Sequence, residues 1–484
     1  MVIRNTFMIF AALLVSGLVN FGSISVFSRL LNPTEYGTFA LATASSALAI
    51  AFLFQWVLHS FIRFLPQRNA DDNKRYMINF MAILAVMSFG FMALAALSYT
   101  LNSAMGNMFP SLPLAVWFLV PAAAIGETAF NVISHYTRLV REHIRLFAIA
   151  TICRSLLYIG VGYYLVESGY SYTGLLFALV LSFFIPGLYL WATDPDSRRL
   201  VRGDIKRDVV REIMAFGFPI IAVTTVQTAI SSTDNFLLTY FIGPAATGQY
   251  AVVLDLVTKS LIFLMIIVHR TTYPLLVKKL EHEGIEATRI QYRHNTIILM
   301  ALSIPACVGL AILSKNIATL LLGEEFRETA GQLIPFLTLV SFTNCAFQFY
   351  LTPAFHLAKK THLMILPVVV ALITNLLVSS YCIPHFGITG AIIGSFCAYL
   401  VSFSLSLYFI KRVFPLPFPA LDMLKITVAA FLMGASIWGF QGGQSPSGLL
   451  LAVVIGGTVY SIACIALNVG EYRNLIIRRF RLPK

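Results

Sequence analysis

Arg29-Leu-Leu-Asn-Pro33-Thr-Glu35-Tyr36-Gly37-Thr-Phe39-Ala40 is a short polar turn between two long apolar runs. Pro33 cannot continue a helix, and Gly37 can open the next one. The same spacing of Pro and Gly recurs 211 residues later in Gly243-Pro244-Ala-Ala-Thr-Gly248-Gln-Tyr250-Ala251. Both stretches share the pattern Pro-x-x-x-Gly-x-aromatic-Ala. We interpret them as one turn present in two copies of a larger unit.

Two further matches support this repeat. Tyr172-Thr-Gly174 and Ile388-Thr-Gly390 each open an apolar run, and they lie 216 residues apart. A looser match aligns the segment 135–141 with 353–359, a shift of 218. The chain therefore reads as two copies of one unit of roughly 200 residues that run in the same direction, an arrangement typical of transporters.

The composition indicates a membrane protein. Of the 484 residues, 58% are hydrophobic and 11% are charged, whereas a soluble domain carries about 25% charged residues. The net charge is +13, but the basic residues are spread between apolar runs, which argues against a nucleic-acid partner. The six cysteines are interpreted as small apolar residues because none forms a CxxC pair or lies at metal spacing from His: Cys153, Cys307, Cys345, Cys382, Cys397 and Cys464.

The apolar runs predict an all-α polytopic fold with about fourteen transmembrane helices, since about 20 mostly apolar residues cross a bilayer. The predicted helices span 7–30, 37–62, 77–100, 113–137, 146–166, 172–191, 213–241, 247–277, 295–314, 329–354, 363–383, 388–410, 425–441 and 448–468. We expect three parts: an N-lobe over 1–212 with helices 1–6, a C-lobe over 213–412 with helices 7–12, and 413–484 with an extra helix pair and a basic tail.

The basic residues predict the orientation. Cytoplasmic loops carry the excess of Lys and Arg in membrane proteins. If the N-terminus is inside, the inner segments hold 28 of the 34 Lys and Arg, and the outer loops hold only Lys315 and Arg327. This alternation predicts that both termini are cytoplasmic. The remaining four lie inside the apolar runs: Arg29, Arg154, Lys259 and Arg270.

Two further segments mix basic and apolar residues at helical spacing. They are 198–213 and the tail 472–484. Such segments bind the surface of an anionic leaflet, so inner-leaflet lipids are expected partners. The alternative is a solvated linker and a frayed tail.

A family resemblance emerges at this point. A first helix ending in Ser28-Arg29-Leu-Leu-Asn-Pro33-Thr-Glu-Tyr36-Gly37, the related stretch from Pro244 to Tyr250 after Asp234, and six plus six helices with an extra pair occur together. The chain thereby resembles the polysaccharide-unit (Wzx-type) flippases of the multidrug/oligosaccharidyl-lipid/polysaccharide (MOP) exporter superfamily. The resemblance implies two six-helix lobes around a central cavity. It also implies transport of an undecaprenyl-pyrophosphate-linked sugar unit, for O-antigen, capsule or exopolysaccharide, across the bacterial inner membrane, with polysaccharide polymerase and export machinery as candidate partners.

Cationic side chains in the apolar runs are the candidate substrate site. A charge at mid-bilayer costs about 2.5–3.5 kcal/mol on insertion scales, so it usually faces a partner or a wet cavity. Arg offers a planar fork of donors to phosphate oxygens, and we expect a basic ring that binds the pyrophosphate. The alternative is that Arg63 and Arg270 extend to the inner headgroups. The expected substrate-binding residues are Arg154, Arg270, His59, Arg63 and His269.

Embedded acids are the candidate ion-coupling residues. Glu127 lies near the middle of helix 4 and Asp234 lies in helix 7. Asp255 and Lys259 are four residues apart, so they can pair on one helical face. Unpaired intramembrane carboxylates can carry a coupling proton or sodium ion. The alternative is a structural role as ion pairs or hydrogen-bond partners.

No enzyme signature competes with a transporter. Gly442-Gly443-Gln444-Ser445 is a turn without Lys, so it is no Walker loop, and neither a metal set nor a catalytic triad is evident. No cofactor is expected. The alternative function is a cation-coupled small-molecule (drug) antiporter of the same superfamily. A lipid-pyrophosphate substrate favours several embedded Arg, whereas cationic drugs favour embedded acids.

Overall fold

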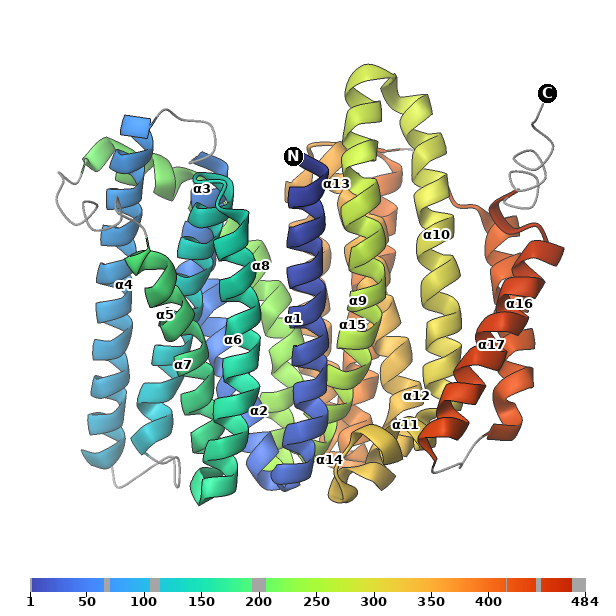
Figure 1. Ribbon diagram of the computed structural model, residues 1–484, viewed down its shortest axis with the longest axis horizontal. Helices are drawn as coiled ribbons and strands as arrows, with labels where there is room; N and C mark the ends of the chain where they lie inside the picture. Colours follow the sequence, from blue (N-terminus) through green and yellow to red (C-terminus); the bar gives the residue numbers. More distant parts are fainter. Residues whose placement is uncertain are drawn as a thin grey trace. The chain divides into compact units, whose positions relative to one another are not determined.

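The computed structural model describes residues 2–64, 70–104, 114–193, 206–414, 416–440 and 445–471, and these residues form helices and no strand (Figure 1). This agrees with the all-α prediction. The α-helices are α1 (Val2–Leu30), α2 (Pro33–Ala49), α3 (Gln55–Phe64), α4 (Ala70–Ala104), α5 (Leu114–Leu139), α6 (Ile144–Leu165), α7 (Ser171–Ala192), α8 (Arg207–Phe241), α9 (Pro244–His282), α10 (Gly284–Ile312), α11 (Ser314–Leu321), α12 (Glu324–Ala346), α13 (Thr352–Leu357), α14 (Ile365–Phe386), α15 (Ile388–Lys411), α16 (Ala420–Ile437) and α17 (Pro446–Ala466).

Short irregular turns connect some of these helices. Three are π-helical: η1 (Ile50–Phe54), η3 (Val166–Tyr170) and η5 (Phe347–Leu351). Three are 3₁₀-helical: η6 (Thr361–Met364), η7 (Trp438–Phe440) and η8 (Val469–Glu471). A π turn widens the helix locally and often marks a functional site. The turn η1 joins α2 to α3 in one continuous path, so a single apolar segment from Pro33 to Phe64 contains all three.

The chain divides into two compact units. Unit 1 comprises Met1–Thr239 and Gly243–Gly248, and unit 2 comprises Tyr240–Ile242 and Gln249–Lys484. Unit 1 therefore holds α1 to α8 almost entirely, together with the first turn of α9. The rest of α9 and the helices that follow belong to unit 2.

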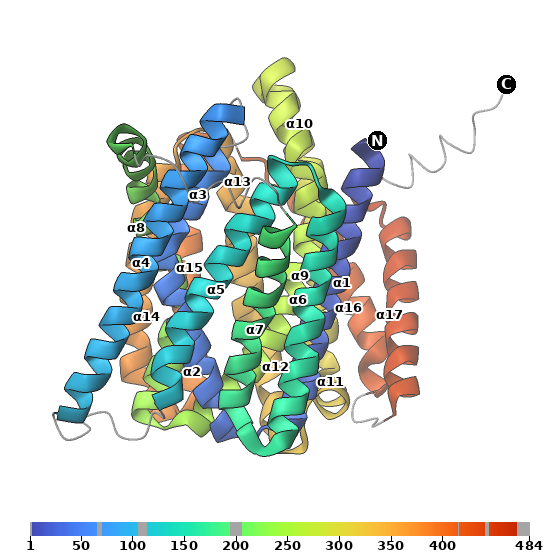
Figure 2. The ribbon, with the colours of Figure 1, turned by 60° about the vertical axis from the view of Figure 1, so that its left-hand side comes forward.

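Unit 1 packs through two helix groups. The helices α5, α6 and α7 lie side by side (Figure 2), and α1 packs against α6. A second core joins α3, α4, α5 and the start of α8, with Phe54, Phe61 and Phe80 at its centre. Ile213 of α8 is fully buried in this core.

Unit 2 is organised around paired helices. The helices α14 and α15 pack closely along their length, and α12 packs against α15. The pair α16 and α17 packs against α10 through an apolar cluster that contains Leu313, Met433, Ile437 and Ala452. Small residues allow the close approach of α14 and α15: a Cβ at Gly394 would overlap the hydroxyl of Ser379.

Twelve helical segments of the described residues are long and apolar enough to cross a membrane. The chain is therefore an all-helical polytopic membrane protein, as the sequence predicts. One of the twelve segments, Ile144–Ala192, contains both α6 and α7, which are separated by Gly169 at φ +91° and Ser171 at φ +47°.

The predicted amphipathic segment at 198–213 needs a correction in its described part. Residues 198–205 and the tail 472–484 lie outside the described residues. From Arg207 onward the chain already belongs to α8, which begins earlier than predicted. The carbonyl of Ile213 accepts a hydrogen bond from the Ser60 hydroxyl at 3.2 Å, and Tyr76 donates to the Glu212 carboxylate. The apolar face of this stretch packs on α3 and α4.

Candidate functional site

The repeated turn forms the start of α2 and of α9. Asn32 caps α2, because its side-chain oxygen accepts from the Glu35 backbone N–H at 2.9 Å and the Glu35 carboxylate accepts from the Asn32 N–H at 3.1 Å. The other oxygen of Glu35 accepts from the Ser171 hydroxyl at 2.6 Å, which ties this turn to the start of α7. Pro244 opens α9 directly after Gly243, whose φ is +120°.

The two copies of the turn contact each other through their glycines. A Cβ at Gly37 would overlap the Pro244 carbonyl oxygen and would lie 2.8 Å from the Gly248 nitrogen. The reverse also holds, because a Cβ at Gly248 would overlap the Pro33 carbonyl oxygen and would lie 2.8 Å from the Gly37 nitrogen. This reciprocal contact explains the shared spacing of Pro and Gly, since only residues without a Cβ permit it.

The predicted site residues of α3 lie among polar groups of unit 1. The ring of His59 is half-buried, 3.4 Å from the Gln55 amide, and it interacts electrostatically with His135 of α5. His135 in turn lies 3.0 Å from the Arg138 guanidinium. Arg63 is exposed in the last turn of α3. His59 is therefore part of a cluster of cationic and imidazole side chains.

Arg154 lies near two aromatic rings and interacts electrostatically with an acidic side chain. Its guanidinium carbon is 5.1 Å from the ring centre of Phe183 and 5.9 Å from that of Phe130. It interacts electrostatically with Glu127 of α5. Arg154 was predicted to need an anion or water in the membrane, and the fold supplies the carboxylate of Glu127 together with two aromatic faces.

The other two predicted cations lie in unit 2. His269 of α9 stacks on Tyr273 with ring centres 5.1 Å apart, and it meets the edge of Phe349 at 5.6 Å. It also interacts electrostatically with His356 and with Arg270, which is exposed. His269, Phe349 and Tyr350 line a small cavity of about 20 Å³, which is room for about one water.

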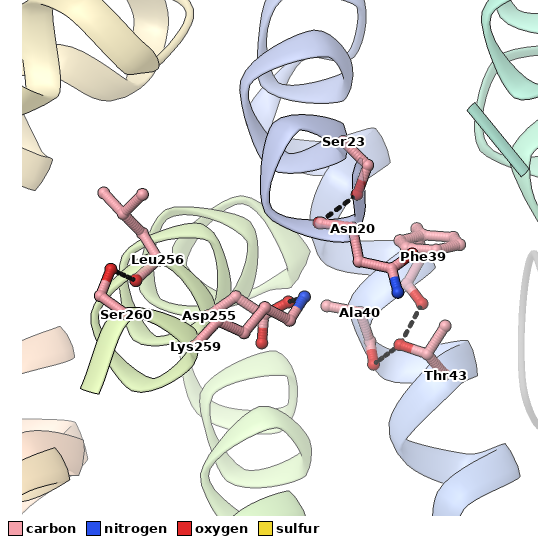
Figure 3. A network of polar contacts seen from close by, with 9 residues as sticks. All are labelled: Asn20, Ser23, Phe39, Ala40, Thr43, Asp255, Leu256, Lys259 and Ser260. Carbon is pink, nitrogen blue, oxygen red and sulfur yellow. Dashed lines mark hydrogen bonds and ion pairs between the residues drawn. The ribbon is translucent and has the colours of Figure 1, made fainter. Parts of the chain in front are cut away.

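The three predicted acids differ in environment. Asp255 pairs with Lys259 at 2.8 Å on an exposed face of α9, as the sequence predicts (Figure 3). Asp234 of α8 is 1% exposed and interacts with another group of the protein. Glu127 makes no hydrogen bond within the described residues and lines a cavity. Figure 3 also shows three hydrogen bonds inside unit 1: the Ser23 hydroxyl donates to the Asn20 carbonyl, and the Thr43 hydroxyl lies within bonding distance of the carbonyls of Phe39 and Ala40.

The cavity at Glu127 contains residues that the sequence analysis did not single out. It measures about 320 Å³ and lies wholly in unit 1. The sequence did contain a signal for this cavity. Thr224, Gln227 and Thr228 lie three and four residues apart in an apolar run, so they share one helical face. The lining residues of the cavity are Ala47, Ile50, Ala51, Gln55, Glu127, Thr224, Gln227 and Thr228.

The sequence profile of a family described as "Polysaccharide biosynthesis protein" (Polysacc_synt_3) matches residues 26–331, more than half of the chain. The chain belongs to this family. No curated protein matches it. The family profile begins just before the polar turn at Arg29 and extends past the second copy of that turn.

Solved structures show which fold this family member has. The chain is similar to "Lipid II flippase MurJ, inward closed conformation", with a TM-score of 0.76 and 13% identity over 97% of this chain and 100% of that one. An inward-facing multidrug resistance MATE family transporter of the MOP superfamily matches with a TM-score of 0.60 and 14% identity over 82% of this chain and 95% of that one. A MOP superfamily transporter from Pyrococcus furiosus matches with a TM-score of 0.55 and 14% identity over 85% and 95%. The family member therefore has the fold of MOP superfamily transporters.

Proposed function

We propose that the protein flips an undecaprenyl-pyrophosphate-linked oligosaccharide unit across the bacterial inner membrane for O-antigen, capsule or exopolysaccharide assembly. The observation that carries the proposal is the combination of a polysaccharide biosynthesis family with a fold like that of a lipid II flippase. A lipid-linked sugar is the substrate class that fits both findings. Polysaccharide polymerase and export machinery are the partners this role implies.

We propose headgroup-binding cations in each of the two units, considered separately. His59 and Arg63 of unit 1 and His269 and Arg270 of unit 2 bind the pyrophosphate, because guanidinium groups offer paired donors to phosphate oxygens. The exposure of Arg63 and Arg270 supports this role. Arg154 of unit 1 is a further proposed headgroup-binding cation, and it also interacts electrostatically with Glu127.

The proposed transport cycle is alternating access of two repeats, 1–212 and 213–412, with 413–484 as an added part. Two facts support fourteen crossings rather than the twelve candidate spans. The span Ile144–Ala192 contains two distinct helices, α6 and α7, and α8 is a further helix of 35 residues outside the twelve spans. Fourteen crossings and the alternation of basic residues favour cytoplasmic termini and contact with anionic inner-leaflet lipids.

A genetic experiment tests the function. Removal of the protein should make the lipid-linked oligosaccharide accumulate with its sugar on the inner leaflet, where a membrane-impermeant glycosidase added to spheroplasts cannot reach it. An Arg63→Ala, Arg270→Ala double variant should fail to restore polymer export at normal membrane abundance. Lys at both positions should restore part of it, because the charge remains while the paired donors are lost.

The antiporter alternative makes the opposite prediction for these variants. It requires that Glu127 or Asp234 is indispensable and that both arginines are replaceable. Full polymer export by the double Ala variant, combined with loss of cation-coupled drug efflux in Glu127→Gln, would replace the flippase proposal with the antiporter.

A further inference from the structure

The cavity of unit 1 has the size of a ligand site. Its volume of about 320 Å³ lies at the lower end of the roughly 300–1,000 Å³ found for small-molecule pockets. The cavity beside His269 in unit 2, at about 20 Å³, has room for about one water. The unit 1 cavity can therefore take a group much larger than a single water or ion.

Five helical segments line the cavity: α2, η1, α3, α5 and α8. Ala47 of α2 and Ala51 of η1 are small, so they leave space beside Gln55 at the start of α3. The π turn η1 lies within this wall, and turns of this kind are frequent at functional sites. The small apolar side chains of Ala47 and Ala51 and the wider turn of η1 leave a space at this point. Elsewhere α2 and η1 pack against α5.

The polar groups of the wall are mostly uncharged. Thr224, Gln227 and Thr228 share one face of α8, opposite residues supplied by other helices. The Thr228 hydroxyl donates to the Thr224 carbonyl at 2.9 Å, which leaves its oxygen free to accept. Gln227 has no hydrogen-bond partner among the described residues, so its amide can both donate and accept.

The charge of the wall disfavours a phosphate, and the interaction of Glu127 with Arg154 weakens the attraction of the wall for a cation. None of the eight lining residues is cationic, and Glu127 is the single charged group. Arg154 interacts electrostatically with Glu127 from α6 and so balances it. What remains is an array of amides, hydroxyls and one balanced carboxylate. This array suits a ligand that is rich in hydroxyl groups, because each sugar hydroxyl both donates and accepts.

We infer that this cavity recognises the uncharged sugar portion of the lipid-linked substrate, with Gln55, Gln227 and Thr228 as its hydrogen-bonding residues. The inference rests on the proposed function and adds to it a division of labour. The cationic side chains bind the pyrophosphate, and the mostly uncharged cavity of unit 1 binds the carbohydrate. Sugar specificity then depends on α3 and α8 of unit 1.

A binding comparison tests the inference. The purified full-length protein in nanodiscs is titrated with two probes: undecaprenyl pyrophosphate without sugar, and the undecaprenyl-pyrophosphate-linked oligosaccharide extracted from cells that lack the transporter. The wild type should bind the glycosylated probe about tenfold more tightly than the bare one, since a few hydrogen bonds of ordinary strength give a ratio of this order. The Gln227→Ala, Thr228→Val variant should bind both probes alike, with unchanged affinity for the bare lipid.

Matched variants separate folding from recognition. Gln332→Ala changes an exposed glutamine of α12 outside the cavity and should keep the wild-type ratio. Thr228→Val keeps the side-chain shape without the hydroxyl and should lower the ratio by about threefold, so it tests the cavity if the double variant does not fold. A double variant that retains the preference for sugar overturns the inference, as does a wild type without any preference. A wild type that binds neither probe refutes the proposed function itself.

Discussion

Glu127 and Arg154 lie on the neighbouring helices α5 and α6 and interact electrostatically inside a membrane-spanning part of unit 1. Removing one partner of a buried ion pair leaves an uncompensated charge, whereas removing both does not. This asymmetry gives a test that distinguishes a protein-internal pair from a residue that binds substrate directly.

We expect Arg154→Met to lower the free energy of unfolding by about 2 kcal/mol, less than for a fully buried pair because Arg154 is partly exposed. Adding Glu127→Gln should restore most of the loss. Thermal melts of the purified variants measure both effects. The control is Arg63→Met, which removes an exposed Arg and should leave the melting temperature unchanged. If Glu127→Gln fails to restore Arg154→Met, the pairing does not explain the position of Arg154.

The sequence identified both members of this pair but not their partnership. An Arg in the middle of an apolar run is visible at once, because burial of charge is costly everywhere along a membrane helix. Which carboxylate meets it depends on how two helices pack. The same limit applies to Gln227 and Thr228, since a polar residue becomes part of a cavity only through what its neighbours leave empty.

The glycine contact between α2 and α9 predicts a sharp steric effect. Gly37→Ala places a Cβ against the Pro244 carbonyl oxygen, and a backbone atom cannot move aside as a flexible side chain can. We expect a loss of about 1–3 kcal/mol of stability, the usual range for overpacking, together with reduced transport. Gly248→Ala should behave alike, because the contact is reciprocal.

Gly90→Ala is the matched control for the glycine variants. Gly90 lies within α4 with no atom near the position of a Cβ. Alanine there should be neutral or stabilising by up to about 1 kcal/mol, since glycine is the poorer helix former. Melting temperature and membrane abundance are measured for all three variants. Equal values for Gly37→Ala and Gly90→Ala would contradict the close approach of the two turns.

A buried carboxylate links the helix pair α16 and α17 to the rest of unit 2. Asp422, in the first turn of α16, accepts from the Arg293 guanidinium of α10 at 3.0 Å and from the Gly470 N–H at 3.0 Å. Its side chain is 6% exposed. The carboxylate thus links α10, α16 and η8, the turn that follows α17.

We expect Asp422→Ala to loosen this helix pair and to cost about 1–2 kcal/mol, because a half-buried N–H and a half-exposed guanidinium both lose their acceptor. Limited proteolysis should then release a fragment cut in the 412–419 connection faster than in the wild type. Asp422→Asn should show a smaller effect, since its amide oxygen can still accept one bond. Asp255→Ala, which removes an exposed ion pair, is the control and should leave the cleavage rate unchanged.

The sequence predicted the all-helical membrane architecture of the chain, whereas its site residues stay predictions. The length of apolar runs depends only on local composition, so the all-helical membrane fold follows from it directly. The Pro-x-x-x-Gly repeat identified two turns that meet in unit 1. The start of α8 was predicted too late in the sequence, because Arg207 to Ile213 mix charged and apolar residues. This pattern is typical of a surface segment as well as of a helix that packs on α3 and α4.

The orientation of the chain in the membrane yields a prediction for the protein in cells. Fourteen crossings with cytoplasmic termini place the connection after α4 and the one before α17 outside, and the start of α8 inside. Single cysteines are introduced at Ala104, Ser445 and Arg207 after the six native cysteines are replaced. A membrane-impermeant maleimide added to spheroplasts should label the variants at 104 and 445 and spare the one at 207, which should react only after permeabilisation.

The alternation of charge makes this labelling pattern sensitive to a single error in the helix count. If α6 and α7 together crossed only once, every later segment would change sides, and position 445 would become protected while 104 stayed accessible. If the whole chain were inverted, only position 207 would react from outside. Labelling at 104 and 445 without labelling at 207 therefore requires an even number of crossings between 104 and 445 and an odd number between 104 and 207. These parities fit α5, α6 and α7 as three separate crossings and α8 as a transmembrane helix.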